Sequence, residues 1–179
     1  MKVRKPILGT LLASVLFFEA CTIPAWVNTV ESDAAVAAPI AASLIDVIDP
    51  ALAPVVTLIG NGFSALVKTV GAYKASPTAT NLQAVQSAFE AVDANVAQLE
   101  SSAQIKNPAT QNTVTAVVQL LTQAVTEIAA LVPPAAATAE PGALLRVHGQ
   151  AKGWKAQDFK KKFNAIIQGD PRFAGKEIK

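Results

Sequence analysis

Residues 80–132 decide the fold, and they read TNLQAVQSAFEAVDANVAQLESSAQIKNPATQNTVTAVVQLLTQAVTEIAALV. Thr80 and Gln83 match the two ends of a capping box, so we predict that a helix begins at Thr80. Apolar residues then recur in alternating steps of three and four, which is the spacing of a heptad seam on one helix face. These residues are Leu82, Val85, Phe89, Val92, Val96 and Leu99.

A second apolar seam with the same period follows a break near residues 101–106. Asn107 and Pro108 are typical of a helix start, and Pro133 ends the pattern. The seam residues are Val114, Val118, Leu121, Val125, Ile128 and Val132. Two helices of about 25 residues, each roughly 37 Å long, joined by a short connector predict an antiparallel helical hairpin.

The hairpin needs a cover, because apolar residues such as Val117 and Leu120 flank its seam. Residues 22–79 are apolar and have a helical period between 40 and 70, interrupted by prolines such as Pro39. We expect a break or kink at residues 60–62, which read Gly-Asn-Gly. The predicted fold class is therefore all-α, with the hairpin inside a three- to four-helix bundle. A second copy of the chain is the alternative cover, which would make a homo-oligomer.

The composition points toward contact with a membrane. Hydrophobic residues make up 51% of the chain and charged residues 16%, against about 25% charged in a typical soluble domain. Residues 50–67 carry no charge, which is the lower limit of length for a membrane-spanning helix. The same segment fits a buried helix of the bundle, and its prolines and glycines favour that interpretation.

The N-terminus has the layout of an export signal. Lys2, Arg4 and Lys5 precede an uncharged, mostly apolar stretch at residues 7–18, which is too short to span a membrane, and Cys21 follows it. Residues 1–21 resemble a bacterial lipoprotein signal peptide, although Glu19 stands where that family has a small residue. Cleavage without lipidation and an uncleaved N-terminal anchor are the two alternatives.

The resemblance implies that Cys21 is lipidated and becomes the mature N-terminus. Membrane lipid would then be the first partner, since two or three acyl chains anchor a protein far more firmly than one. The expected location is the cell envelope, on the periplasmic side. Thr22, rather than Asp, follows Cys21, which favours the outer membrane in a Gram-negative host.

Residues 133–150 are rich in alanine and proline and are predicted to form a flexible linker to a basic tail at residues 151–179. Residues 22–145 contain nine acidic residues and three lysines, whereas residues 146–179 contain nine basic residues and three acidic ones. A short helix is predicted over 155–168. Its apolar face contains Phe159, Phe163, Ile166 and Ile167, and Lys155, Lys160 and Lys162 flank that face.

The basic helix has two candidate roles. It can dock on the acidic bundle, or it can contact an anionic membrane surface while its lysines reach the headgroups. We take Lys155, Phe159, Lys160, Lys162, Phe163 and Ile166 as the residues of this candidate contact. Nucleic acid is not an expected partner, because Trp154 alone offers no stacking platform.

No residue pattern indicates catalysis or a bound cofactor. His148 is the only histidine and has no cysteine or carboxylate at a metal-ligand spacing, so no metal site is expected. Ser64 lacks the second glycine of a nucleophile elbow, and no phosphate-binding loop is present. We therefore expect a protein that is not an enzyme.

Two functions fit these features. The first is an exported, membrane-anchored lipoprotein whose helical bundle acts as a structural or interaction module of the cell envelope. The alternative is a small integral membrane protein with spans near residues 7–27 and 50–67 and a basic cytoplasmic tail. That layout resembles the phage holins and agrees with the positive-inside rule.

Overall fold

The computed structural model describes residues 23–103, 111–133 and 155–179, and all regular structure in these residues is helical. The elements are α1 (Ala25–Ser43), α2 (Ala53–Ala75), α3 (Ala79–Ala103), α4 (Gln111–Leu131), α5 (Ala156–Ile167) and a single 3-10 turn, η3 (Pro171–Phe173). The predicted all-α class is confirmed. The signal with Cys21, and residues 134–150 of the predicted linker, lie outside the described residues.

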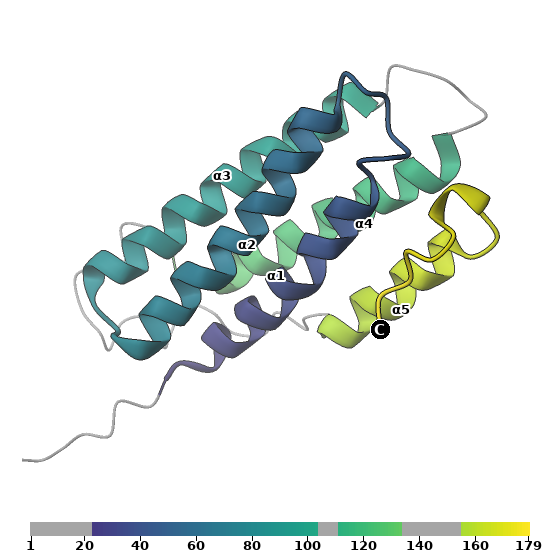
Figure 1. Cartoon of the computed structure of the whole chain (residues 1–179). Coiled ribbons are helices and arrows are strands. Elements are labelled where there is room, and N and C mark those ends of the chain that lie inside the picture. The colour runs from purple at the N-terminus through teal and green to yellow at the C-terminus, as the bar shows by residue number, and fades with distance from the viewer. Residues whose placement is uncertain (1–22, 104–110, 134–154) are drawn as a thin grey trace, which may run out of the picture.

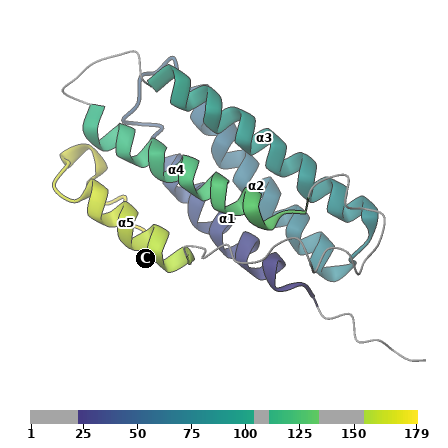
Figure 2. The same ribbon diagram turned by 180° about the vertical axis from the view of Figure 1, so that it is seen from behind.

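Helices α1 to α4 form a closed four-helix bundle of up-down-up-down topology (Figures 1 and 2). Each helix packs on the next one along the chain, and α4 packs back on α1. The shorter α5 lies outside this ring, against α1 and α4. Helices of the same chain therefore cover the hairpin of α3 and α4.

The two predicted seams lie in the core. Leu82, Val85, Val92, Val96 and Leu99 are buried on α3, and Val118, Leu121, Val125, Ile128 and Val132 are buried along α4 and just beyond its end. Phe89 and Val114 are partly buried. Val117 and Leu120, which a lone hairpin would expose, are buried as well. This wide apolar face of α4 is what α1 and α5 cover.

Helix α2 runs without interruption through Gly60 and Gly62, so the predicted break is wrong. The reason is packing against α3. A Cβ atom on Gly62 would lie 2.7 Å from Cγ2 of the buried Val92, so this glycine allows the two helices to approach closely. Such tertiary contacts override the poor helix propensity of glycine.

Helix α1 also continues through Pro39, where the sequence pattern predicts an interruption. Pro39 is exposed and stands one turn before the helix end at Ser43. The true interruption is the connection at residues 44–52. There the Asp49 side chain accepts a hydrogen bond from the backbone N–H of Ala51 (2.9 Å), and α2 begins with Pro54 in its first turn.

The turn between α2 and α3 is closed by side-chain hydrogen bonds. The Thr78 hydroxyl accepts from the backbone N–H of Asn81 (3.2 Å), and Asn81 Nδ2 donates to the carbonyl of Ser76 (2.7 Å). Helix α3 therefore begins at Ala79, and Thr78 is its cap instead of the predicted Thr80.

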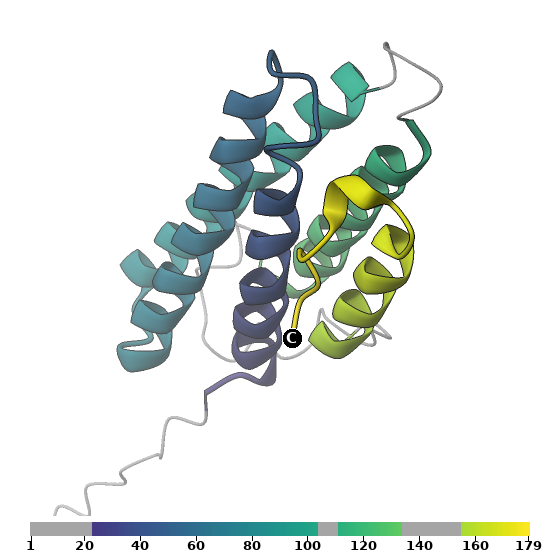
Figure 3. The ribbon, with the colours of Figure 1, turned by 45° about the vertical axis from the view of Figure 1, so that its right-hand side comes forward.

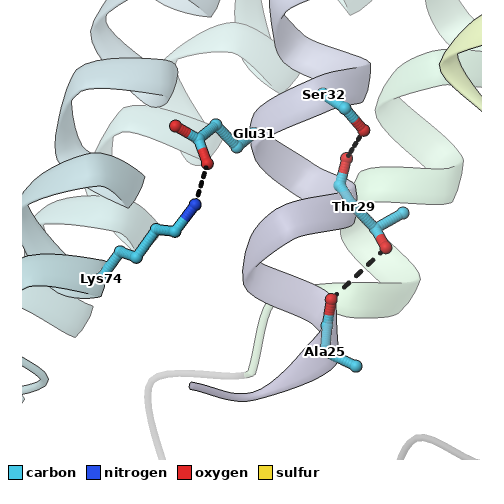
Figure 4. A network of polar contacts seen from close by, with 5 residues as sticks. All are labelled: Ala25, Thr29, Glu31, Ser32 and Lys74. Atoms are coloured by element: carbon cyan, nitrogen blue, oxygen red, sulfur yellow. Dashed lines mark hydrogen bonds and ion pairs between the residues drawn. The ribbon is translucent and has the colours of Figure 1, made fainter. Parts of the chain in front are cut away.

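The start of α1 is fastened to the end of α2. Trp26 stacks on Tyr73 with ring centroids 5.5 Å apart, and Lys74 forms an ion pair with Glu31 (3.0 Å). Figure 4 shows this pair beside Thr29 and Ser32, whose hydroxyls donate to carbonyls of α1 itself. These contacts set which face of α1 lies against α2.

We expect Gly62→Ala to lower the free energy of unfolding by about 1–3 kcal/mol, because the new methyl group overpacks the contact with Val92. Gly71→Ala is the matched control on the same helix, since a Cβ atom there meets nothing within 4 Å. It should stabilise the protein by up to about 1 kcal/mol. Urea denaturation followed by circular dichroism measures both. Equal effects of the two substitutions would contradict the close approach at Gly62.

Candidate functional site: the docked C-terminal helix

Helix α5 begins where the sequence predicts it, and its first turn is capped by an acidic side chain. Asp158 accepts a hydrogen bond from the backbone N–H of Lys155 (3.0 Å). An acidic residue in the first turn is also favourable for the helix dipole. The helix ends at Ile167, before Gly169, whose φ of 89° is readily adopted by glycine.

The apolar face of α5 is turned into the protein. Phe159, Phe163 and Ile167 are buried, and Ile166 is partly buried. The helices that cover this face are α1 and α4. In this structure the phenylalanine side chains named as candidate contacts are therefore part of the core.

The lysines of α5 lie at or near the surface. Lys155, Lys161 and Lys162 are exposed, and Lys160 is partly buried. Lys160 donates to the backbone carbonyl of Lys179 (2.9 Å), and Lys162 donates to Gln123 of α4 (3.4 Å). The candidate contact residues thus divide into a buried apolar group and an outward basic group.

The last residues of the chain fold back along α5, a feature that the sequence analysis missed (Figure 3). Asn164 makes two hydrogen bonds with the backbone of Ile178, one as donor and one as acceptor, both 3.0 Å long. Phe173 is buried, and Lys176 pairs with Asp46 beyond the end of α1. In the sequence, the apolar residues Phe173 and Ile178 could have indicated that this segment packs on the bundle.

An ion pair between Asp170 and Arg172 holds the turn at which the chain reverses direction after α5. Asp170 accepts from the backbone N–H of Arg172 (3.1 Å) and from its guanidinium. These hydrogen bonds hold the pKa of the Asp170 carboxyl well below its ordinary value. Asp170 therefore stays ionised over the whole physiological range.

Asp33 of α1 is the residue of this region that sequence reasoning did not find. It is only 1% exposed, and neither of its carboxylate oxygens has a hydrogen-bond partner. Burial, with a smaller contribution from the negative charge of Glu127 on α4, raises the pKa of Asp33 from 3.8 to about 7. Its position among Val30, Ala34 and Ala37 was the available signal, since all three are buried apolar residues.

The position of Asp33 follows from the contacts of its own helix. Residues two apart in an α-helix point to nearly opposite sides. Glu31 points to α2, where it pairs with Lys74. Asp33 therefore points away from α2, to the side of α1 on which α4 and α5 pack.

No metal-binding group of three or more His, Cys, Asp or Glu side chains occurs among residues 23–103, 111–133 and 155–179. An open groove between α1 and α2 is lined by small residues such as Ala38, Ala42 and Gly60. Its hydroxyl groups, on Thr57 and Ser64, already donate to carbonyls of α2. The groove lining contains no titratable side chain.

Two helical segments, Ala53–Ala75 and Asn112–Leu131, are long and apolar enough to cross a membrane. Length and composition alone support this, and core helices of a bundle share both properties. No protein-family model, curated protein or solved structure matches the chain.

Asp33 should make the stability of the protein depend on pH. Its pKa is raised on folding, so its stabilising contribution is complete below about pH 4 and is lost as the pH rises to about 7. Relative to Asp33→Asn, the wild type should lose about 1.4 kcal/mol for each pH unit in that window. Urea denaturation at several pH values measures the difference. Asp93→Asn, at an exposed position of α3, is the control and should leave the pH profile unchanged.

Proposed function

We propose that the chain is a lipoprotein of the bacterial cell envelope, in which acylated Cys21 tethers the helical bundle as a structural or interaction module on the periplasmic side. The observation that carries this proposal is the placement of Cys21 directly after a basic and apolar N-terminal segment and directly before the bundle. Helix α1 begins at Ala25, four residues after the cysteine. Four residues span at most about 14 Å, so the tether would be short.

A short tether at Cys21 would give the bundle an orientation. The start of α1 lies at the same end of the bundle as the turn between α2 and α3, as the Glu31–Lys74 pair indicates. The end of α4 is there too, because buried Gln86 of α3 donates to the carbonyl of Pro133 (2.7 Å). This end would face the membrane. The connection at 44–52 would then lie about 28 Å further away, the length of α1.

The basic C-terminal helix offers a second contact with a membrane. Lys155 and Lys161 are exposed and could contact an anionic membrane surface, where each cation contributes about 1 kcal/mol close to the headgroups. With Phe159 and Phe163 buried, such a contact would be electrostatic and sensitive to salt. The membrane lipid around the anchor is therefore the first partner that we propose for the chain.

The packing of the two long apolar helices also agrees with a tethered bundle. α2 buries Ile59, Phe63 and Leu66 against neighbouring helices, and α4 buries Leu121 and Ile128. These particular side chains are covered by protein, without lipid. The alternative is a two-span protein of the holin-like type, and protease treatment distinguishes it from the tethered bundle.

Lipidation is tested by replacing Cys21 with serine and following the incorporation of labelled palmitate in a bacterial host. We expect the label and the membrane association of the full chain to be lost together. Glu19→Ala is the matched control, because it brings the signal closer to the family pattern and should retain or increase labelling. Unchanged labelling and fractionation of Cys21→Ser would overturn the proposal.

Protease treatment of spheroplasts distinguishes the tethered bundle from a two-span protein. A tag placed after Lys179 should be digested when the tail is on the periplasmic side. A tag that survives in intact spheroplasts and is digested after lysis would place the tail in the cytoplasm. That result would favour the holin-like alternative.

A further inference from the structure

We propose that Asp33 makes the docking of α5 dependent on pH, so that the helix is held when this carboxyl carries its proton and detaches more readily when the carboxyl is ionised. The proposal rests on the position of an unpartnered, buried acid behind a helix that the bundle does not need for closure. It is independent of lipidation and of the site of the protein in the cell.

The Asp33 carboxyl is buried inside the protein. Both of its oxygens lack hydrogen-bond partners, and its side of α1 is the one covered by α4 and α5. An ionised carboxylate without partners is strongly unfavourable in such a place. The group can escape this cost in two ways, by binding a proton or by gaining access to water.

The charged groups around Asp33 do not offer it a positive partner. Glu127 of α4 acts on it with a negative charge. Several cations of the surrounding elements have other described partners, namely Lys74 with Glu31, Lys162 with Gln123, Lys160 with the carbonyl of Lys179, Arg172 with Asp170, and Lys176 with Asp46. Lys155 and Lys161 of α5 are exposed, away from the buried Asp33. Asp158 of α5 accepts from its own first turn, and the buried side chains of that helix are apolar.

Among the possible openings, release of α5 exposes Asp33 to water with the smallest loss of structure. The contacts of α1 with α2, α2 with α3, α3 with α4, and α4 with α1 close the ring without α5. Helix α5 has 12 residues, and the part of it that enters the core is Phe159, Phe163 and Ile167. Its departure, together with the returning segment at 171–179, would leave the four-helix ring intact and uncover one side of α1.

The pH range of the effect follows from linkage. The docked form holds the proton of Asp33 until about pH 7, whereas the released form, with Asp33 in water, gives it up near pH 4. The opening constant of α5 should therefore rise about tenfold for each pH unit between these values and stay level above about pH 7. Ionisation raises the opening constant only within this window.

Hydrogen exchange of the full chain, resolved by peptide mass spectrometry, measures this opening. After correction for the intrinsic pH dependence of exchange, amides of α5 should lose up to about a hundredfold in protection from pH 5 to pH 7. Amides of α2 and α3 exchange through unfolding of the ring, so at every pH they should stay better protected than those of α5. In Asp33→Asn the pH dependence of α5 should disappear, and in Asp93→Asn it should remain as in the wild type.

Two further variants keep the test decisive. Phe163→Ala removes a buried anchor of α5 and should expose this helix to exchange at every pH, which shows that the measurement detects release. If Asp33→Asn does not fold, Glu127→Gln replaces it. Loss of the Glu127 charge should lower the pKa of Asp33, so the opening constant of α5 should become independent of pH at a lower pH than in the wild type. An unchanged α5 profile in these variants, or a protection of α5 equal to that of α2 and α3 at every pH, would overturn the proposal.

Discussion

The closure of the helical ring by α1 against α4 is the contact on which the rest of the structure depends. Helix α4 is apolar over more than one face, since Val117 and Leu120 are buried together with the seam residues Leu121 and Val125. Packing against α3 alone cannot cover so wide a surface. Once α1 closes the ring, the seam between α1 and α4 remains as the place where α5 docks. The position of the C-terminal helix is thus a consequence of the width of the apolar face of α4.

The regular apolar spacing of the sequence predicts this architecture well, whereas the proline and glycine residues that usually interrupt helices predict it poorly. The seams on α3 and α4 are long and regular, so their buried residues could be named in advance. Pro39, Gly60 and Gly62 are strong local signals of a break, yet α1 and α2 continue through them. Local propensity is overridden there by contacts that a single sequence does not reveal, such as the approach of α2 to Val92. The same holds for the cap of α3, which the sequence predicts at Thr80 and the turn geometry places at Thr78.

The candidate site was also predictable from the sequence only in part. The apolar and basic faces of α5 follow from helical spacing, so Phe159, Phe163 and the lysines could be named from the sequence. Which of two surfaces the apolar face covers could not be decided, because a bundle and a membrane offer the same driving force to phenylalanine. Asp33 was not predicted for a different reason. An acid two residues from Glu31 in an alanine-rich helix resembles a solvated residue, and its apolar neighbours alone do not show that α4 and α5 cover it.

The position of Asp33 is difficult to explain by stability alone. Its near neighbours on α1 are alanine and valine, and a residue of that kind would fill the same place without a desolvation penalty. The ring does not need the acid, since the contacts that close it are apolar. The penalty falls on the side of α1 that α4 and α5 cover and not on the side toward α2, where Glu31 pairs with Lys74. Helix α4 is also held by α3, whereas α5 packs mainly on α1 and α4 among the described helices, so the cost weakens the docking of α5 first. In this bundle, therefore, the element that carries the basic surface is also the element whose attachment is least secure when Asp33 is ionised.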